Sequence, residues 1–344
     1  MSDKLPAAPF RVNMAAPRSG PALHQAGAKG LTRNMTWVPG GDFLMGGDDF
    51  YPEERPVRRV AVDGFWIDEH PVTVAEFRRF VAATGYVTVA ERPLDPAQYP
   101  GADPALLSPG SLVFFPTSGP ADLRDVSQWW RYTPGAGWRH PAGPGSTLHG
   151  LERHPVTHVA AEDADAYAAW AGKEVPTEAE WEFAARGGLP GAVFTWGDDP
   201  APKGRVMANT WHGEFPWQNL KPPGKRGTTP VKSFPPNGYG LYDMAGNVWE
   251  WTSDYFVAER AAPACCVPRN PRVTSPEAGL VPGEPGAHIP RRVIKGGSHL
   301  CAPNYCLRYR PAARQGEAVD TSTAHLGFRC VVRAMPRDDA RGPQ

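Results

Sequence analysis

Cysteine is scarce in this chain of 344 residues, which contains only five. They stand at positions 265, 266, 301, 306 and 330, an odd number spread thinly. Proteins built on disulfide scaffolds have dense and usually even sets of cysteines. The sequence therefore excludes a fold held together mainly by disulfide bonds.

A charge excess and a long apolar run are also missing. Lys and Arg together number 36, as do Asp and Glu, so the formal net charge is zero and no nucleic-acid partner is predicted. No apolar run is long enough to span a bilayer, and residues 1–30 lack the apolar core of a secretory signal. We expect a cytoplasmic protein without a membrane partner, a disordered leader over 1–30 and a flexible tail over 336–344.

Glycine, proline and tryptophan are abundant, with 37, 40 and 12 residues. Glycine and proline favour turns and loops, while the large aromatic side chains supply burial that a disordered chain lacks. The sequence shows no internal repeat and no domain linker. We therefore expect one compact α+β domain over residues 31–335, with little regular secondary structure.

Local patterns predict a few regular elements. Capping boxes, Thr73 with Glu76 and Thr177 with Glu180, start the expected helices in "TVAEFRRFVAATG" and "PTEAEWEFAARGG". A third helix is expected in "AAEDADAYAAWAGK". The run "MTWVPGGDFLMGG" predicts a hairpin around its Pro-Gly-Gly turn, and "RRVAVDGFWIDEHPVT" a second strand pair. Residues 90–150 predict an irregular excursion that three tryptophans keep packed.

Two cysteines, Cys301 and Cys306, stand five positions apart in "KGGSHLCAPNYCLRYR". On a helix they would face different directions, so a joint role requires a bent or extended backbone. The spacing leaves open two inert core thiols, a reversible disulfide and a two-thiolate site for a soft ion such as Cu(I). Zinc is less favoured, because it needs four ligands and the cysteine pair supplies only two. Arg308 and Arg310 would favour the thiolate by lowering the pKa of the cysteines.

Longer motifs indicate a protein family, which the spacing of the two cysteines alone cannot do. "GGSHLCAPNYCLRYRPAAR" and "HLGFRC" resemble the active-site region of the formylglycine-generating enzymes, the sulfatase-modifying factor family. "WVPGGDFLMGG", "PTEAEWEFAARGG", "ANTWHGEFP" and "PNGYGLYDMAGNVWEWTSDY" match as well, in the family's order, from about residue 35 to 333. The S-x-x-C-x-x-x-x-C element is the specific one, because a wider superfamily shares the GNVWEW and LGFR-type motifs.

The resemblance implies a C-type-lectin-like fold, the sulfatase-modifying-factor fold, and a bacterial-type aerobic activity. Such enzymes oxidise the cysteine of a C-x-P-x-R motif in an unfolded or nascent sulfatase polypeptide to Cα-formylglycine. Dioxygen is the oxidant, a thiol is the reductant and Cu(I) is the cofactor. The class would be an oxidoreductase acting on a sulfur group with oxygen as acceptor. We expect a monomer whose partner is the sulfatase polypeptide.

The resemblance also assigns catalytic residues. Cys301 and Cys306 match the two copper-binding cysteines, and a substrate cysteine would add a third sulfur, which suits a soft metal. Ser298 matches a serine near the oxygen pocket, where its hydroxyl could hydrogen-bond a reduced oxygen species. Trp249 matches a tryptophan beside that pocket, and Tyr305 an active-site tyrosine.

Two structural calcium sites are implied too, because mixed carboxylate and backbone oxygens suit a hard cation. The first would use the side chains of Asp243 and Glu250 with the carbonyl oxygens of Gly246 and Val248. The second would use Asn209 and the carbonyl oxygen of Thr210. Its expected acidic ligand falls in "QNLKPPGKRG", which has none.

Other departures and two rival functions complete the prediction. Some relatives have a histidine where Ala302 stands, and Cys330 lacks its usual partner, so Cys330 should be a free core thiol in a reducing compartment. No motif assigns a role to Cys265 or Cys266. One rival is an iron oxygenase of the same superfamily acting on a small thiol or histidine derivative, but no histidines show an H-x-x-x-H-x-E spacing. The other is a non-catalytic lectin-like binding module, which the presence of both active-site cysteines disfavours.

Overall fold

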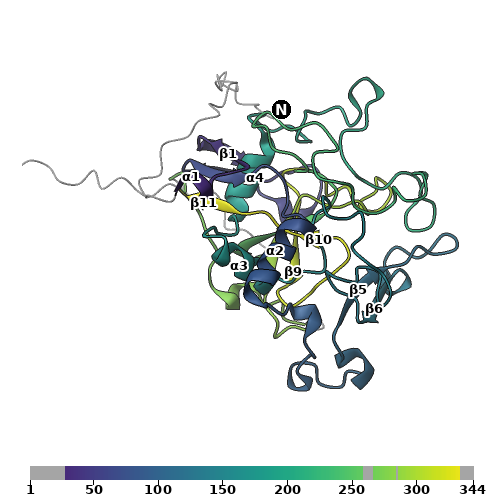
Figure 1. Ribbon diagram of the computed structural model, residues 1–344. Coiled ribbons are helices and arrows are strands. Elements are labelled where there is room, and N and C mark those ends of the chain that lie inside the picture. Colours follow the sequence, from purple (N-terminus) through teal and green to yellow (C-terminus); the bar gives the residue numbers. More distant parts are fainter. Residues whose placement is uncertain (1–27, 259–265, 284–285, 334–344) are drawn as a thin grey trace, which may run out of the picture.

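The computed structural model describes residues 28–258, 266–283 and 286–333, and short elements there alternate with long loops (Figure 1). The α-helices in these ranges are α1 (Ala28–Leu31), α2 (Val74–Thr84), α3 (Ala161–Trp170) and α4 (Glu178–Arg186). The strands are β1 (Met35–Val38), β2 (Gly41–Met45), β3 (Arg58–Val62), β4 (Phe65–Asp68), β5 (Gly110–Phe114), β6 (Trp130–Pro134), β7 (Trp249–Tyr255), β8 (Arg291–Lys295), β9 (Arg314–Ala318), β10 (Leu326–Gly327) and β11 (Val331–Arg333). The 3-10 helices are η1 (Pro52–Glu54), η2 (Val89–Glu91), η3 (Pro96–Gln98), η4 (Pro104–Leu107), η5 (Val126–Gln128), η6 (Pro202–Gly204) and η7 (Pro276–Gly279). The expectation of an α+β domain with little regular secondary structure is confirmed.

Among the first four strands, the inner two pair with each other and the outer two pair with each other. β1 pairs with β4, which also pairs with β11, while β2 pairs with β3, all antiparallel. The predicted hairpin between β1 and β2 is therefore wrong, as is the predicted pairing of β3 with β4. A Cβ atom added at Gly40 would lie 2.6 Å from backbone atoms of Asp63 and Gly64. The β1–β2 connection thus packs against the β3–β4 connection, and this packing directs β2 away from β1.

A four-stranded sheet in the order β10-β7-β8-β9 supports the loop that carries the two cysteines. β7 and β8 are antiparallel, with Glu250 opposite Lys295, and β10 runs parallel to β7. Trp249 begins β7, and the cysteine loop follows the end of β8. The sheet therefore brings the GNVWEW and GGSHLC motifs to the same end.

The three predicted helices are present. α2 and α4 each begin with the expected capping box, in which Thr73 and Thr177 accept the backbone N–H groups of Glu76 and Glu180. Both helices end at a glycine in the left-handed conformation. α3 lies beside α2 (Figure 1). These helices form where the sequence supplies local start and stop signals.

The excursion over residues 90–150 is packed, as predicted. Trp129 and Trp138 are 0% and 1% exposed, and Trp130 is half-buried. Its antiparallel pair of strands, β5 and β6, was not predicted and lies at the side of the molecule away from β1 (Figure 1). The tryptophans therefore attach this loop-rich segment to the rest of the domain.

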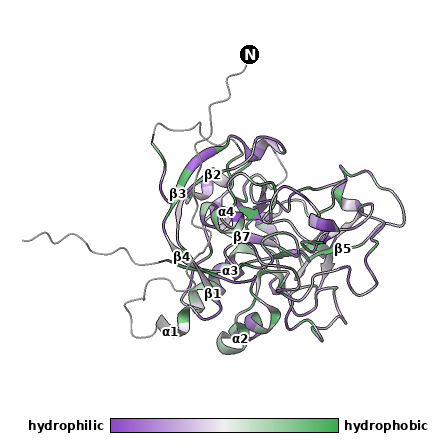
Figure 2. Cartoon of the chain, turned by 90° about the horizontal axis from the view of Figure 1, so that it is seen from above, coloured by the Kyte–Doolittle hydropathy of each residue, from purple (hydrophilic) through white to green (hydrophobic). Residues whose placement is uncertain are grey.

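Helix α4 lies near the middle of the molecule with β7, as the view from above shows (Figure 2). Every residue of α4 is buried, including its charged ones. Glu182 contacts Lys295 of β8 at 3.0 Å and Arg186 at 2.7 Å. The side chains of Glu182 and Lys295 are fully buried. Buried charges persist only when they are paired and hydrogen-bonded. These ion pairs therefore hold loop-rich segments in place where the sheets are small.

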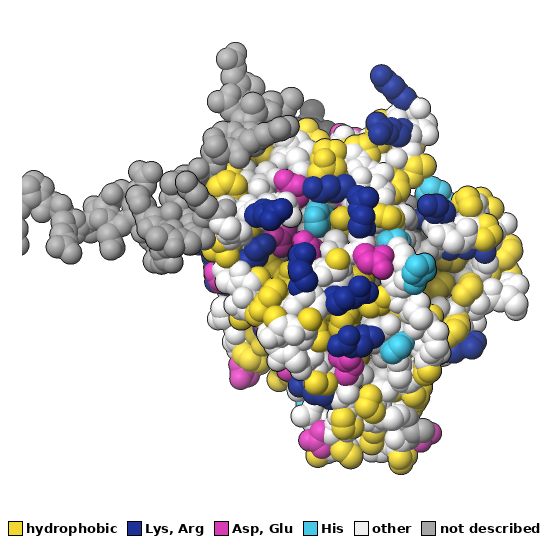
Figure 3. Space-filling view, in the orientation of Figure 1, with side chains coloured by type: hydrophobic (Ala, Val, Ile, Leu, Met, Phe, Trp, Pro, Cys, Tyr) yellow, Lys and Arg dark blue, Asp and Glu magenta, His cyan; other side chains and the backbone are white. Residues whose placement is uncertain are grey.

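The outer surface mixes residue types. Lys and Arg side chains spread over the face in Figure 3, with Asp, Glu, His and hydrophobic side chains among them. No helix in the described part of the chain has the length and apolar character to cross a bilayer. The predicted leader and tail fall almost entirely outside the described residues, so both stay predictions.

Candidate active site

The cysteine loop is closed at its base by a glycine pair. After β8 the chain turns through Gly296 and Gly297, whose φ angles are 91° and 67°. A Cβ atom at Gly297 would lie 2.9 Å from the backbone nitrogen of Tyr309 and 3.0 Å from the carbonyl oxygen of Arg308. Only glycine allows this approach without strain. The loop 298–307 is thereby folded back on itself.

This closed loop brings the two predicted cysteines together. The sulfur atoms of Cys301 and Cys306 lie 3.2 Å apart. The backbone N–H of Cys306 donates to the carbonyl oxygen of Ala302 at 2.7 Å, which bends the chain between them. Cys301 is buried and Cys306 is half-buried. The bent backbone that a joint role requires is present, and one sulfur lies nearer the surface than the other.

The two thiols differ in acidity. Burial raises the pKa of Cys301 well above its usual value, and the neighbouring Cys306 adds to this effect. The pKa of Cys306 is lowered, first by the hydrogen bond from Cys301 and then by the charge of Arg308. Cys306 is therefore the more acidic thiol of the pair, with Cys301 as its donor.

The two arginines after the cysteines belong to ion pairs with η1. Arg308 contacts Glu53 at 2.7 Å and lies over the ring of Tyr51, while Arg310 pairs with buried Glu54. Their positive charges are thus partly neutralised by carboxylates. The predicted effect of these arginines on the thiols is present at Cys306, but burial outweighs it at Cys301.

Ser298 is fully buried at the start of the loop and contacts Cys301 and a histidine. Its backbone N–H donates to the sulfur of Cys301 at 3.4 Å, and its hydroxyl oxygen accepts the N–H of Leu300 at 3.2 Å. The hydroxyl also lies 3.2 Å from Nδ1 of His325. Burial lowers the pKa of His325 to about 3, so this imidazole is neutral. His325 belongs to the motif "HLGFRC", but the motif alone did not predict a role for it.

Aromatic rings enclose the loop. Trp249 is buried in the same apolar cluster as Cys301 and Tyr309. Tyr305 stacks on Phe215, with ring centroids 4.4 Å apart, and burial raises its pKa to about 12. The structure therefore gathers the five predicted catalytic residues around one loop. It adds Tyr309, which sequence reasoning missed because nothing in the local pattern marks it.

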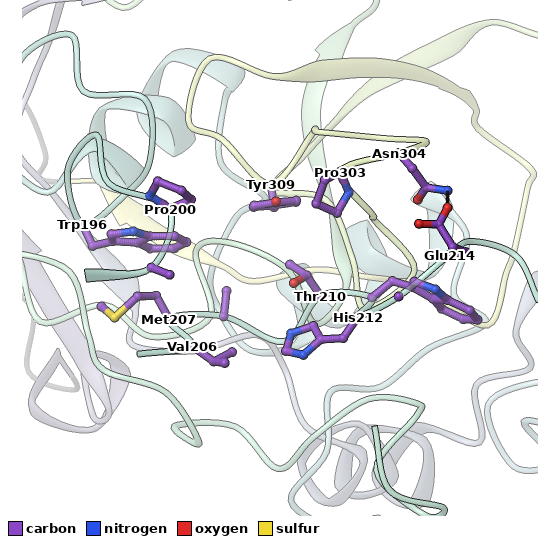
Figure 4. A pocket seen from close by; sticks show the side chains of 14 residues that line it. Trp196, Pro200, Val206, Met207, Thr210, His212, Glu214, Pro303, Asn304 and Tyr309 are labelled. Atoms are coloured by element: carbon purple, nitrogen blue, oxygen red, sulfur yellow. Dashed lines mark hydrogen bonds between the residues drawn. The ribbon is translucent and has the colours of Figure 1, made fainter. Parts of the chain in front are cut away.

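A pocket of about 480 Å³ lies against the outer side of this loop (Figure 4). Asn304 donates from Nδ2 to the Glu214 carboxylate at 3.0 Å across one end of it. Tyr309 belongs both to the pocket wall and to the buried cluster around Cys301. The other residues of the pocket wall are mainly apolar: Trp196, Pro200, Ala201, Val206, Met207, Ala208, Thr210, Trp211, His212, Gly213 and Pro303. A peptide side chain of ordinary size would fit there.

The first predicted calcium site has two buried carboxylates near each other. Both oxygens of Glu250 accept hydrogen bonds from Arg329, each at 2.7 Å, and Trp181 adds a third. Asp243 accepts a backbone N–H from Lys232 at 2.9 Å, and burial raises its pKa, with Glu250 adding to the rise. Arg329 thus pairs with the Glu250 carboxylate but reaches Asp243 only at its carbonyl oxygen, at 3.4 Å. The remaining negative charge and the free lone pairs of these oxygens fit a cation that shares Glu250 with Arg329.

The second predicted calcium site does not fit such an ion. The ammonium group of Lys221 donates directly to the side-chain oxygen of Asn209. Burial lowers the pKa of Lys221 to about 8, which leaves it charged in most molecules at neutral pH. Thr210, the residue after Asn209, lines the pocket. A positive group therefore stands at the oxygen that was predicted to bind a metal.

The remaining cysteines and histidines form no further metal centre in the described residues, where no three His, Cys, Asp or Glu side chains are grouped to hold an ion. The iron-oxygenase alternative thus lacks a ligand cluster in those ranges. Cys330 is a buried free thiol, as predicted. Cys266 is exposed, and Cys265 lies outside the described residues.

Comparison with known proteins gives a match over nearly the whole chain. Residues 21–334 match the family profile described as a sulfatase-modifying factor enzyme 1-like domain. The chain is 54% identical over 298 residues to a formylglycine-generating enzyme of Mycobacterium tuberculosis, covering 86% of this chain and 96% of that protein. It is also 37% identical over 316 residues to a mouse protein named inactive C-alpha-formylglycine-generating enzyme 2, covering 89% and 88%.

A solved structure shares the fold. PvdO from Pseudomonas aeruginosa aligns with a TM-score of 0.57 at 24% identity, covering 86% of this chain and 93% of PvdO. At this identity the likeness concerns the architecture alone. The sequence relatives include both a generating enzyme and a protein named inactive, so the choice between activity and inactivity depends on the residues of the cysteine loop.

Proposed function

This chain belongs to the sulfatase-modifying factor enzyme 1-like family, and on that premise we propose that it converts the cysteine of a C-x-P-x-R segment in a sulfatase polypeptide to Cα-formylglycine. The observation that carries the proposal is the contact between the sulfur atoms of Cys301 and Cys306, 3.2 Å apart beside a pocket that would take a peptide side chain. Conversion of a sulfatase cysteine is supported by the name of the relative from M. tuberculosis and by the family description.

The chemistry needs two electrons beyond those of the substrate. In the balanced reaction, the substrate thiol, dioxygen, two electrons and two protons give the aldehyde, hydrogen sulfide and water. We propose that a thiol reductant supplies the electrons and protons. The substrate C–S bond is replaced by a C=O bond, and dioxygen is reduced.

The donor set of the loop fits a cuprous ion. Cys301 and Cys306 offer two soft sulfur atoms that can point to one ion, which suits Cu(I) in low coordination. Bound there, copper would supply the redox chemistry with dioxygen. Because Cys306 is only half-buried, the sulfur of a substrate cysteine could approach from its side. The two thiols thus leave room for a third sulfur ligand.

The neighbouring residues orient this site and keep water out of it. The N–H of Ser298 donates to the sulfur of Cys301, which favours the thiolate. Neutral His325 holds the Ser298 hydroxyl in one direction, so that this hydroxyl is preorganised at the start of the cysteine loop. Trp249 is buried in the same apolar cluster as Cys301, and Tyr305 within the loop stacks on Phe215, and these aromatic rings limit the entry of water.

The pocket would take the substrate segment in extended form. Its apolar walls suit side chains on either side of the target cysteine, and Tyr309 lies between the pocket and the cluster around Cys301. Proline in the C-x-P-x-R segment favours an extended backbone. An unfolded or nascent sulfatase meets this requirement, because its target segment is still accessible.

We also propose one structural calcium ion. Asp243 and Glu250, with the carbonyl oxygens of Gly246 and Val248, would hold it next to Trp249 at the start of β7. A hard cation would order this turn, whose residues Asp243, Gly246 and Asn247 all have positive φ angles. The residues at Asn209 do not support a second ion.

The compartment and the assembly are proposals as well. The buried thiol of Cys330 and the sulfur pair in the loop favour a reducing compartment, which we take to be the cytoplasm. We also propose that the chain is a monomer. Light scattering of the purified chain tests the assembly.

Mass spectrometry tests the proposed function. A peptide with a C-x-P-x-R segment is incubated with the enzyme, Cu(I), air and a thiol reductant, and the mass change from thiol to aldehyde is followed. The proposal predicts conversion that requires copper and dioxygen. An unchanged peptide under all conditions, with the peptide still binding, would instead favour the lectin-like binding module.

A further inference from the structure

The region around Asn209 carries a charge of unexpected sign. Between Glu214 and Asp243 the sequence has no Asp or Glu, whereas it has three lysines and one arginine. A calcium site normally draws on carboxylates as well as carbonyl oxygens. The loop that should supply an acidic ligand to Asn209 therefore supplies only positive side chains.

One of these side chains reaches the predicted ligand itself. The ammonium group of Lys221 donates to the side-chain oxygen of Asn209. Backbone groups hold Lys221 in this place, because its N–H donates to Asn219 Oδ1 at 3.1 Å and its carbonyl oxygen accepts from Nε of Arg226 at 3.0 Å. Lys221 is half-buried, unlike Lys225 in the same loop, which is exposed.

Asn209 in turn connects this loop to the first predicted calcium site. Its Nδ2 donates to the Gly227 carbonyl oxygen and to Asn247 Oδ1, both at 3.1 Å. Asn247 then donates to Asp243 Oδ1 at 3.2 Å. A chain of hydrogen bonds thus runs from the ammonium group through two amides to a buried carboxylate. Its ends carry opposite charges.

We propose that the Lys221 ammonium replaces a calcium ion at Asn209, so that this loop keeps its structure without a metal. An ammonium group needs only oxygen acceptors and carries a single charge, which suits a site without carboxylates. A divalent ion placed there would meet Lys221 instead of an acidic ligand.

The contact of Lys221 with Asn209 also affects the position of the pocket wall. Thr210, Trp211 and His212 follow Asn209 directly and form part of the pocket wall. The N–H of Trp211 donates to the carbonyl oxygen of Cys301 at 2.9 Å. By fixing Asn209, Lys221 acts as a positioning residue for this wall.

Counting bound calcium tests the proposal without any measurement of activity. Wild-type chain and the Asp243→Asn variant are dialysed against buffered calcium, and bound metal is measured by elemental analysis. We expect at most one tightly bound ion in the wild type and none in Asp243→Asn. An ion that Asp243→Asn retains, and that the double variant Asp243→Asn/Asn209→Ala loses, would overturn the proposal.

Thermal unfolding of lysine variants gives a second test. Lys221→Met should lower Tm by a few degrees, since it removes a charged hydrogen bond at a half-buried site. The matched variant Lys225→Met should unfold like the wild type. Lys221→Asp should gain a Tm that rises with calcium and falls with chelator by more than in the wild type. An unchanged Tm for Lys221→Met would contradict the assigned role.

Discussion

The sulfur atoms of Cys301 and Cys306 lie 3.2 Å apart, at opposite ends of a short bend in one closed loop. Cys301 is buried in the apolar cluster that contains Trp249, and Cys306 is half-buried against the same cluster. Two soft donors in contact, with access from one side, are suited to share one ion and to admit a third sulfur ligand.

Replacing either cysteine should abolish peptide conversion without unfolding the chain. Serine at position 301 or 306 is close in size to cysteine but is a poor ligand for a cuprous ion. We expect loss of conversion to background in both variants, measured by mass spectrometry, with circular dichroism unchanged. Cys266→Ser, at an exposed position outside the loop, is the matched control and should convert peptide like the wild type. Full activity in Cys306→Ser would remove this residue from the mechanism.

Closing the loop depends on Gly297. Alanine there would force a methyl group to 2.9 Å from the Tyr309 nitrogen at a positive φ angle, so the loop must open. Gly297→Ala should therefore lose at least about 90% of its conversion rate, because small displacements of reacting groups cost about 10²-fold. Gly150→Ala is the control, since Gly150 also has a positive φ angle but has no atom near the added methyl group. Equal rates in the two variants would contradict the role of the closed loop.

Ser298 and His325 should act as one unit. If His325 serves to orient the Ser298 hydroxyl, removing either side chain loses the same interaction. We expect His325→Ala and Ser298→Ala each to lower kcat by about tenfold, and the double variant to lower it little further. The readout is kcat and KM for the peptide, with KM nearly unchanged. Multiplicative losses in the double variant would show that the two residues act independently.

The loss of folding stability at acid pH should depend on His158. This histidine is buried, lies 2.7 Å from the Ser111 hydroxyl, and has a pKa lowered to about 4 by burial. The unfolded chain binds a proton at His158 below about pH 6.5. The stability that neutral His158 supplies is therefore complete above that pH and is lost as the pH falls toward 4.

The matched experiment is urea unfolding of the wild type and His158→Gln at pH 7 and pH 5. The advantage of the wild type in unfolding free energy should shrink by about 2 kcal/mol between these values, since each pH unit is worth about 1.4 kcal/mol in this window. An advantage that stays constant would mean that His158 keeps an ordinary pKa in the fold.

The sequence predicted those features that depend on neighbouring residues. The capping boxes at Thr73 and Thr177 are local signals, and both helices begin there. The pairing of β1 with β4 could not be predicted from such signals, because it depends on how residues 39–41 pack against residues 63–64. Local patterns indicate where strands form, but long-range packing decides which strands pair.

The candidate site also has one part that local sequence predicted and another that it did not. The cysteines were found through a motif within one loop, and their contact follows from the glycine pair beside them. The contact of Ser298 with His325 joins residues far apart in sequence, and Lys221 reaches Asn209 only through the course of a loop without regular structure. Neither pair follows a spacing rule, so the sequence alone did not reveal them.

Copper K-edge X-ray absorption tests the central claim most directly. The reduced protein is loaded with one equivalent of Cu(I) without oxygen, and the spectrum is recorded before and after addition of a C-x-P-x-R peptide. We predict two sulfur ligands before the peptide and three after it, with the third absent for a peptide that has serine in place of cysteine. A copper ion bound mainly by nitrogen or oxygen, or a sulfur count that the peptide does not change, would contradict the account.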